Sequence, residues 1–164
     1  MKAAFLDRDG VINIDYGYVS NIKNFEFKNG IFELLDLLQK KGYKLFIVTN
    51  QSGIARGYYS EDDFHKLMNH IINELKKKDI EIMDYTHCPH HPDITGECEC
   101  RKPNPGMILN LAKKYDINLK NSIMIGDKQS DIQAAKNAGI NKNYLVKDSL
   151  FDIIKKILKD SNEI

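Results

Sequence analysis

Two aspartates near the N-terminus, Asp7 and Asp9, stand two residues apart and are followed by Gly10. A carboxylate can attack a phosphoryl group and hold it as an aspartyl phosphate, which divides ester hydrolysis into two steps. A second carboxyl group two residues on can protonate the leaving oxygen and then deprotonate the attacking water. We therefore interpret Asp7 as a candidate nucleophile and Asp9 as a candidate general acid and base.

Three further side chains would complete this chemistry if the fold brought them to the same place. Asp127 and Asp7 together offer the hard oxygen ligands that Mg²⁺ prefers. The Thr49 hydroxyl and the Lys102 ammonium can stabilise the equatorial oxygens of a phosphoryl group in transit. Each of these residues alone has an ordinary explanation, such as a turn former or a solvated charge. It is their conjunction that indicates a phosphoryl-transfer site.

The elements that must position these residues alternate between strand and helix. Strand patterns are short apolar runs, at 3–6, 44–48, 83–86, 122–125 and 143–146. Amphipathic helical periods separate them, at 31–38, 64–75, 105–112, 133–138 and 150–158. Ser60 and Asp63 resemble a capping box, and Pro105 suits a first helical turn. This alternation predicts an α/β fold with a doubly wound parallel sheet, whose strand ends converge on one ligand crevice.

The composition limits the domain organisation and the classes of partner. A chain of 164 residues predicts a single domain, 1–164, with one core. Lys and Arg number 24 against 23 Asp and Glu, a balance that argues against binding nucleic acid by phosphate neutralisation. The sequence contains neither a membrane-spanning apolar run nor a signal-peptide core. We expect a cytoplasmic monomer with a small-molecule substrate, no nucleic-acid partner and no membrane.

All three cysteines lie in the segment 87–105, which follows no helical or strand period. An odd, clustered set of cysteines without an export signal is a poor disulfide framework. Cys88-x-His90 and Cys98-x-Cys100 supply the three thiolates and one imidazole of a closed tetrahedral zinc site, with His87 and His91 as competing ligands. We expect such a zinc ion to order this loop rather than to activate water. His65 and His70 lie on an amphipathic helix, where we expect no chemical role.

Four strings, in this order, resemble the four motifs of the haloacid dehalogenase superfamily of phosphatases: FLDRDG at 5–10, VTN at 48–50, RKP at 101–103 and IGDK at 125–128. Longer strings resemble the heptose bisphosphate phosphatases within that superfamily: DYGYV at 15–19, TNQSGIARG at 49–57, CPHHP at 88–92 and CECRKP at 98–103. The resemblance implies a Rossmann-like fold of that superfamily, with a small zinc-binding loop at about 87–105 and no large cap domain.

The resemblance also implies an activity and its residues. It implies Mg²⁺-dependent hydrolysis of the 7-phosphate of D-glycero-D-manno-heptose 1,7-bisphosphate, on the route to nucleotide-activated heptose for lipopolysaccharide or another surface glycan. Asp7, Asp127 and the backbone oxygen of Asp9 would hold Mg²⁺, and Thr49 and Lys102 would steady the phosphoryl group. The implied zinc ligands are Cys88, His90, Cys98 and Cys100. The implied substrate contacts are Asp15, Tyr16, Gly17, Tyr18, Asn50, Gln51, Ser52, Lys128 and Arg101, the last of these at the distal end of the substrate.

Three alternatives remain open from the sequence. A histidinol-phosphate phosphatase of the same family shares the catalytic motifs and a similar zinc loop, although the strings at 15–18 and 52–57 favour the heptose. A phospho-accepting signalling receiver also places Asp, Thr and Lys at the ends of a parallel sheet, but it has no use for an acid and base at Asp9. A zinc-dependent binding module leaves the acidic residues unexplained.

Overall fold

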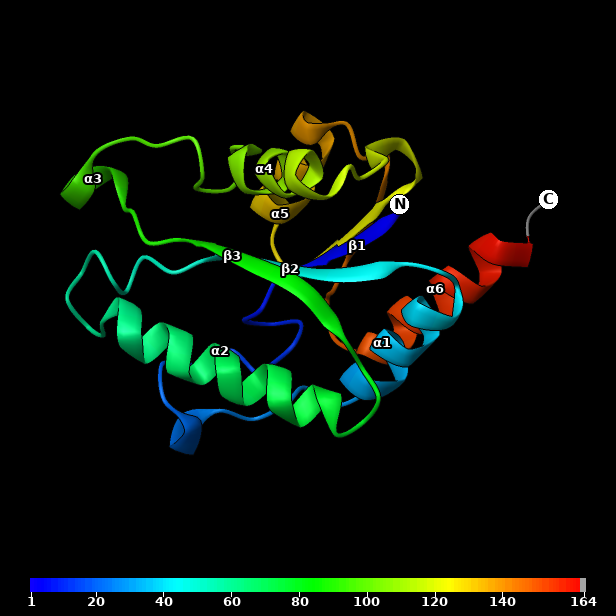
Figure 1. Cartoon of the computed structure of the whole chain (residues 1–164), viewed down its shortest axis with the longest axis horizontal. Helices are drawn as coiled ribbons and strands as arrows, with labels where there is room; N and C mark the ends of the chain where they lie inside the picture. Colours follow the sequence, from blue (N-terminus) through cyan, green and yellow to red (C-terminus); the bar gives the residue numbers. More distant parts are fainter. Residues whose placement is uncertain (163–164) are drawn as a thin grey trace.

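The computed structural model describes residues 1–162 and is built around a five-stranded parallel sheet (Figure 1). The strands are β1 (Ala3–Leu6), β2 (Lys44–Asn50), β3 (Ile82–Cys88), β4 (Ile123–Gly126) and β5 (Lys142–Leu145). They lie in the order β3-β2-β1-β4-β5, so the chain winds outward from β1 first to one side and then to the other. The predicted doubly wound parallel sheet is confirmed.

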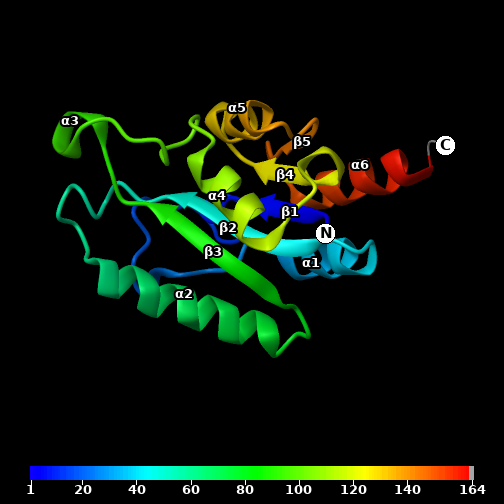
Figure 2. The same cartoon turned by 45° about the horizontal axis from the view of Figure 1, so that its top comes forward.

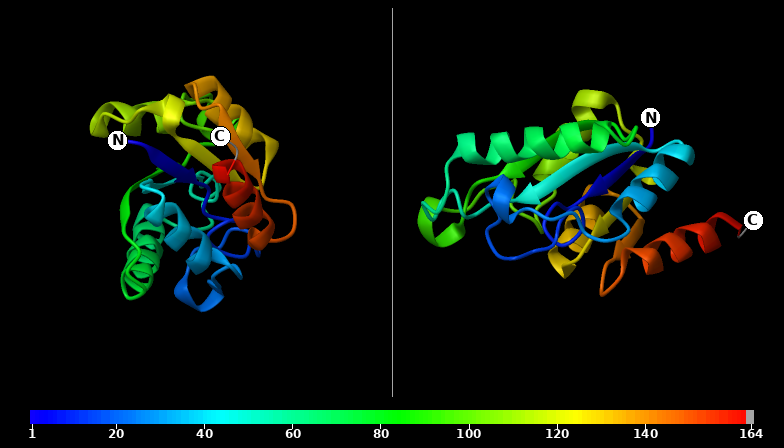
Figure 3. Two further views of the ribbon diagram at one scale, coloured as in Figure 1. Left: turned by 90° about the vertical axis from the view of Figure 1, so that its right-hand side faces the viewer. Right: turned by 90° about the horizontal axis from the view of Figure 1, so that it is seen from below.

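Helices cover both faces of the sheet (Figures 1 and 3). One face carries α1 (Ile31–Lys40), α2 (Glu61–Lys76) and α6 (Leu150–Asn162), and the other carries α4 (Gly106–Tyr115) and α5 (Gln129–Ala138). Short helical turns complete the order, namely α3 (Pro92–Thr95) and the 3₁₀ segments Ile22–Asn24 and Leu119–Asn121. Within residues 1–162, none of the helices has both the length and the apolar character that a membrane span needs.

The strand side chains form two apolar layers because successive residues point to opposite faces of a sheet. In β1, Ala4 and Leu6 join the layer under α1, α2 and α6, whereas Ala3 and Phe5 join the layer under α4 and α5. All four residues are fully buried, as expected for a central strand covered on both faces. Asp7 directly follows this buried strand, so it is the first residue after β1 whose side chain can contact polar groups.

The carboxyl ends of the strands point toward one end of the molecule, where the segment with α3 also lies (Figure 2). β1 pairs with β2 on one side and β4 on the other, with Leu6 opposite both Ile47 and Ile125. Because the chain turns to opposite sides at this point, the crevice beyond β1 and its neighbours is the place where such folds bind ligands.

Several element boundaries differ from those predicted. Helix α5 begins at Gln129 rather than 133, because its first turn is polar and is started by a capping contact in which Asp131 Oδ2 accepts from the Lys128 N–H. Pro105 lies just before α4 rather than in its first turn. The segment 87–105 contains the short helix α3, which the sequence pattern did not reveal. The capping box of α2, formed by Ser60 and Asp63, is confirmed.

Candidate active site

Asp7 lies at the carboxyl end of the central strand and is almost completely buried. Its backbone N–H donates to the carbonyl of Ile125 at 3.1 Å, so the strand pairing with β4 continues as far as this residue. Its side-chain Oδ1 accepts from the Arg8 backbone N–H and from Lys102 Nζ, each at 2.9 Å. These two bonds orient the carboxyl group and leave its second oxygen, Oδ2, as the candidate reacting atom.

Lys102 reaches this carboxyl group from the loop before α4 and is itself buried. Its ammonium contacts three acceptors: Asp7 Oδ1 at 2.9 Å, Asp131 Oδ1 at 2.6 Å and the Val48 carbonyl at 2.9 Å. An ammonium has three hydrogens to donate, so these contacts account for its full capacity.

Asn50, at the end of β2, holds the backbone of Lys102 on both sides. The Lys102 N–H donates to Asn50 Oδ1 at 3.0 Å, and Asn50 Nδ2 donates to the Lys102 carbonyl at 3.3 Å. The amide of Asn50, predicted to contact substrate, is therefore engaged in positioning the lysine.

Asp127 follows β4 and faces Asp7 across the crevice. Its Oδ1 is buried and has no hydrogen-bond partner among residues 1–162. Gly10 packs directly against it: a Cβ on Gly10 would lie 2.0 Å from Asp127 Oδ2, and Gly10 has a φ of +90°. Only glycine meets both conditions, so this residue allows the 7–10 loop to lie against the carboxylate.

The carboxyl groups of Asp7, Asp127 and Asp131 have ligand oxygens that all lie within 4.8 Å of one another, and Lys102 contacts two of these groups, Asp7 and Asp131. Burial raises the pKa of Asp7 to about 8, with Asp131 and Asp9 adding to the increase and Lys102 opposing it. Burial also raises the pKa of Asp127. The pKa of Lys102 is raised as well: its burial acts against this, but the charges of Asp7 and Asp131 outweigh it. Such an excess of buried carboxylates is the donor set that a hard divalent cation would complete.

Asp9 occupies a more open position and belongs to a network of side chains. Its Oδ1 accepts from Arg8 Nη2 at 2.9 Å and from Asn13 Nδ2 at 3.0 Å, and its Oδ2 accepts from Gln51 Nε2 at 3.0 Å. Gln51 Nε2 also donates to the Thr49 hydroxyl at 2.9 Å. The carboxyl group of Asp9 is therefore held near Thr49 while its side chain remains 19% exposed and open to solvent.

Gln51 is buried, and its amide has partners at both ends. Its Oε1 accepts from the hydroxyl of the buried Tyr59, whose pKa burial raises to about 12. The amide of Gln51 thus positions Asp9 and Thr49, although the resemblance had suggested a substrate contact.

The predicted substrate segment 15–18 lies on the surface and is connected to the site by Arg8. All four residues are exposed, and Asp15 Oδ1 accepts from the Gly17 N–H at 3.0 Å. The fully buried Arg8 donates from Nη2 to the carbonyl of Val19 at 2.6 Å as well as to Asp9. Residues 16–19 and 23–26 line a pocket of about 360 Å³.

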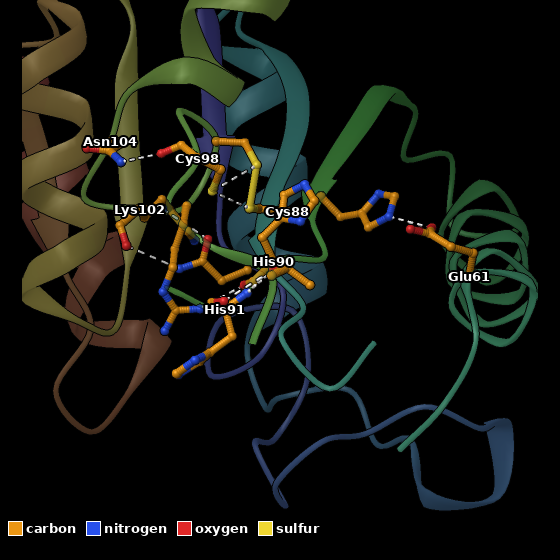
Figure 4. Close-up of a disulfide and its surroundings, with 12 residues drawn as sticks. Glu61, Cys88, His90, His91, Cys98, Lys102 and Asn104 are labelled. Atoms are coloured by element: carbon orange, nitrogen blue, oxygen red, sulfur yellow. Dashed lines mark hydrogen bonds and ion pairs between the residues drawn. A yellow bond between two sulfur atoms is a disulfide. The ribbon is translucent and has the colours of Figure 1, made fainter. Parts of the chain in front are cut away.

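The predicted zinc ligands converge in part (Figure 4). A disulfide joins Cys88 and Cys100, and the Sγ of Cys98 lies 3.5 Å from Cys88 Sγ and 3.6 Å from Cys100 Sγ. The end of β3 and the turn at 98–100 bring the three sulfur atoms into one group, as expected, but two of them are bonded to each other rather than free. Among the described residues, this group comprises the three cysteines without His90.

Arg101 and Lys128, two further predicted substrate contacts, remain accessible. Arg101 is half-buried, and its Nη1 donates to the His90 carbonyl at 3.3 Å, away from the buried ammonium of Lys102. The side chain of Lys128 is exposed at the start of α5. Ser52 is half-buried in the loop after β2.

The structure thus brings Asp7, Asp127 and Lys102 together and links Asp9 to Thr49, as the sequence indicated. It adds Asp131, which the sequence analysis missed. The signal was available: a second aspartate four residues after Asp127 falls in the first turn of α5, on the side of the crevice. Arg8 and Tyr59 were also missed, because nothing in their spacing predicts that a guanidinium or a phenol would be buried.

Comparison with known proteins places this geometry in a family. Residues 11–144 match the family model described as haloacid dehalogenase-like hydrolase. The chain belongs to this family. It is also 54% identical over 147 residues to the D-glycero-alpha-D-manno-heptose-1,7-bisphosphate 7-phosphatase of Campylobacter jejuni, covering 90% of this chain and 83% of the relative. It is 48% identical to the D-glycero-beta-D-manno-heptose-1,7-bisphosphate 7-phosphatase of Haemophilus influenzae, covering 89% and 82%.

A solved structure supports the same assignment for this haloacid dehalogenase-like hydrolase. The D,D-heptose 1,7-bisphosphate phosphatase of B. bronchiseptica, complexed with magnesium and phosphate, superposes with a TM-score of 0.82 at 27% identity. The match covers 98% of this chain and 99% of that one. The described residues of this chain form a parallel sheet flanked by helices, and they contain no separate cap domain.

The raised pKa of Asp7 predicts how the stability of this hydrolase varies with pH. The native carboxyl group keeps its proton up to about pH 8, whereas in the unfolded chain it loses the proton near its ordinary value of 3.8. The native state therefore binds more protons across this window, and the free energy of unfolding falls as pH rises through it. Asp7→Asn removes this titration, so we expect its decline to be shallower than that of the wild type.

Urea unfolding between about pH 5 and about pH 8, in buffer without added divalent cations, measures this difference in slope. Asp148→Asn, at an exposed position, is the matched control and should follow the wild-type curve. Parallel curves for the wild type and Asp7→Asn would show that the carboxyl group of Asp7 is not held protonated.

Proposed function

We propose that this protein is a phosphatase that removes the 7-phosphate of D-glycero-D-manno-heptose 1,7-bisphosphate through an aspartyl phosphate on Asp7. The observation that carries the proposal is the buried Asp7 carboxyl group, anchored by Lys102 at the carboxyl end of the central strand. The names of relatives at 45–54% identity supply the substrate class. Both anomers occur among those names, so the proposal leaves the anomer open.

In the first chemical step, Asp7 Oδ2 attacks phosphorus and the bond from phosphorus to the C7 oxygen breaks. Lys102 and the Arg8 N–H hold the other oxygen of the same carboxyl group, which directs the attack to Oδ2. The Lys102 ammonium also lies where it can offset the negative charge of the phosphoryl oxygens as they pass through the transition state.

Asp9 transfers the protons. Its carboxyl group gives a proton to the departing C7 oxygen, so the sugar leaves as an alcohol. The resulting carboxylate then takes a proton from the water that attacks the aspartyl phosphate, which releases inorganic phosphate and restores Asp7. Gln51, Asn13 and Arg8 keep the carboxyl group in reach, and the Thr49 hydroxyl beside Gln51 contributes a donor to the phosphoryl oxygens.

Asp7 and Asp127, with the backbone oxygen of Asp9, would hold Mg²⁺. The buried Oδ1 of Asp127, which has no partner within residues 1–162, fits this role, whereas both oxygens of Asp131 are engaged by Lys102 and the Lys128 N–H. Mg²⁺ bound there would keep the carboxylates ionised and offset the charge of the incoming phosphate. Asp131 is then a positioning residue that holds Lys102 in place.

Cys88, His90, Cys98 and Cys100 would hold a structural zinc ion. Sulfur ligands of a tetrahedral zinc ion lie about 3.8 Å apart, close to the separations of Cys98 from the other two sulfurs. The fit requires reduction of the Cys88–Cys100 disulfide and a turn of the His90 ring toward the sulfurs. Four protein ligands close the coordination shell, so this zinc would order the backbone that carries Arg101 and Lys102.

The remaining predicted contacts can be divided between the two phosphate groups of the substrate and its sugar. Lys102 is buried against Asp7 and serves the transferred phosphoryl group, while Arg101 and Lys128 remain accessible to the phosphate at the distal end. The exposed segment 15–18 and Ser52 would contact the sugar. We place the enzyme in the cytoplasm as a monomer, supplying heptose 1-phosphate for nucleotide-activated heptose.

The activity can be tested by phosphate release from a panel of esters. With Mg²⁺ present, we expect turnover of one or both anomers of the heptose 1,7-bisphosphate and little turnover of histidinol phosphate. Asp7→Asn should abolish turnover because it removes the nucleophile, and Asp9→Asn should lower kcat by roughly two to four orders of magnitude. Preference for histidinol phosphate, or an active Asp7→Asn variant, would contradict the substrate or the mechanism respectively.

The separate roles of Arg101 at the distal phosphate and of Lys102 at the transferred phosphoryl group are tested with heptose 1,7-bisphosphate and heptose 7-phosphate. Arg101→Ala should lower kcat/KM mainly for the bisphosphate, because a guanidinium can grip the distal phosphate and that binding energy orients the reacting end. Lys102→Ala should lower kcat/KM for both substrates about equally. An unchanged ratio between the two substrates in Arg101→Ala would rule out its distal role.

The Lys102 measurement needs a stability control, since the variant leaves Asp7 and Asp131 buried without their cation. We expect the free energy of unfolding to fall by about 3–5 kcal/mol. Lys102→Met fills more of the vacated space, and equal losses on both substrates in the two folded variants would exclude a packing defect.

Zinc is tested by metal analysis of protein purified under reducing conditions without chelator. We expect about one zinc per chain and a loss of that zinc in Cys98→Ser. Ser161→Ala, a position outside this region, is the control. Reduced wild-type protein without zinc would contradict the proposed ligand set.

A further inference from the structure

We propose that Glu61, His65 and His87 form a second metal site, which takes a borderline transition-metal dication such as Zn²⁺, Ni²⁺ or Co²⁺. Their ligand atoms all lie within 4.8 Å of one another. Two of the ligands come from the first turns of α2 and the third from the end of β3. No part of the proposed phosphatase chemistry uses these three side chains.

The geometry of the three ligands favours coordination of a small cation. Glu61 and His65 are four residues apart on one helix, so their side chains project from the same face. Glu61 Oε2 lies 2.6 Å from His87 Nε2 and 3.7 Å from His65 Nε2. Ligand atoms about 2.0–2.1 Å from a tetrahedral ion lie about 3.3 Å apart. Each of the two distances to Glu61 therefore differs from the value for a coordinated pair by less than 1 Å, and the two imidazoles lie within 4.8 Å of each other.

The surroundings orient both imidazoles so that their Nε2 atoms face the carboxylate. The Nδ1 of His65 lies 2.7 Å from the hydroxyl of Tyr85, whose oxygen can accept a hydrogen bond from the Nδ1–H. Metal-bound histidines commonly donate the second ring N–H in this way. The ring of His87 stacks on Phe64 at a centroid distance of 4.2 Å. These contacts prepare the two nitrogen ligands before a metal arrives.

The site is separate from the sulfur group although His87 and Cys88 are neighbours in sequence. Successive strand residues point to opposite faces, so Cys88 joins the core under α4 while His87 packs against α2. Figure 4 shows Glu61 on the helix at the far side of β3 from the cysteines. One metal would therefore lie on each face of the same strand end.

The ligand types decide the kind of metal. Two imidazoles and one carboxylate suit Zn²⁺, Ni²⁺, Co²⁺ and Cu²⁺ better than Mg²⁺, which prefers oxygen ligands and water. The side chains of Glu61 and His65 are 48% and 45% exposed, so an ion can enter from solvent and keep water in its open positions. Bound there, it would tie the start of α2 to the end of β3.

The test is calorimetric titration of Zn²⁺ into the full-length reduced protein as purified, at neutral pH. We expect the wild type to bind one equivalent that Glu61→Gln and His65→Ala bind roughly tenfold more weakly or not at all. Tyr85→Phe, which removes only the second-sphere contact, should weaken the same equivalent. His70→Ala removes a histidine of the same helix outside the group and should bind as the wild type does.

The comparison between variants makes the outcome independent of the sulfur group, whose ligands are unchanged in all of them. Titration with Co²⁺ gives a second readout, because nitrogen and oxygen ligands lack the sulfur-to-metal absorption of a thiolate site. Circular dichroism of the metal-free variants verifies that they are folded. Identical isotherms for the wild type, Glu61→Gln and His65→Ala would overturn the proposal, as would loss of the equivalent in His70→Ala.

Discussion

The buried contact between Lys102 and the carboxyl groups of Asp7 and Asp131 is the constraint on which the rest of the structure depends. Charges without partners are expensive in a protein interior, so each member requires the others at hydrogen-bond distance. The three residues come from the end of β1, the loop before α4 and the first turn of α5. Meeting this requirement brings three separate parts of the chain to one point, and Asn50 and Val48 of β2 complete the enclosure of the lysine.

The cluster of Asp7, Asp127, Asp131 and Lys102 contains more carboxyl groups than cations, and this excess of acidic groups bears on the chemistry of the site. Three carboxyl groups lie close together, one ammonium contacts two of them, Asp7 and Asp131, and burial raises the pKa of Asp7 and of Asp127. The proposed attack by Asp7 requires the ionised carboxylate, and the raised pKa means that the protein alone does not supply this form at neutral pH. An arrangement that costs stability until a cation arrives suits a site whose activity depends on a bound divalent ion.

Much of this could be predicted from the sequence, because strand ends are easy to recognise. Apolar runs that stop at Asp7 and Asp127 predicted both the parallel sheet and the crevice, since strands of a parallel sheet end on one edge. The sequence analysis did not predict Asp131 or the polar first turn of α5. Helical periodicity is recognised from apolar residues, and this helix has none before Ile132. The hydrogen bonds that Asn50 and Gln51 make within the protein could not be predicted for another reason: they depend on partners distant in sequence, namely Lys102 for Asn50 and Asp9 for Gln51.

At the end of β3, two consecutive residues contribute to two different candidate metal sites, one on each face of the sheet. His87 and Cys88 are consecutive, yet the alternation of side chains sends one toward α2 and the other toward α4. The sulfur group on one side leads directly along the chain to Arg101 and Lys102. On the other side, α2 follows the loop that carries Gln51 and Tyr59, which position Asp9. Metal ions bound at the two proposed sites would therefore contact segments that support different parts of the candidate active site: Lys102 through one face of the strand, and Asp9 through the other.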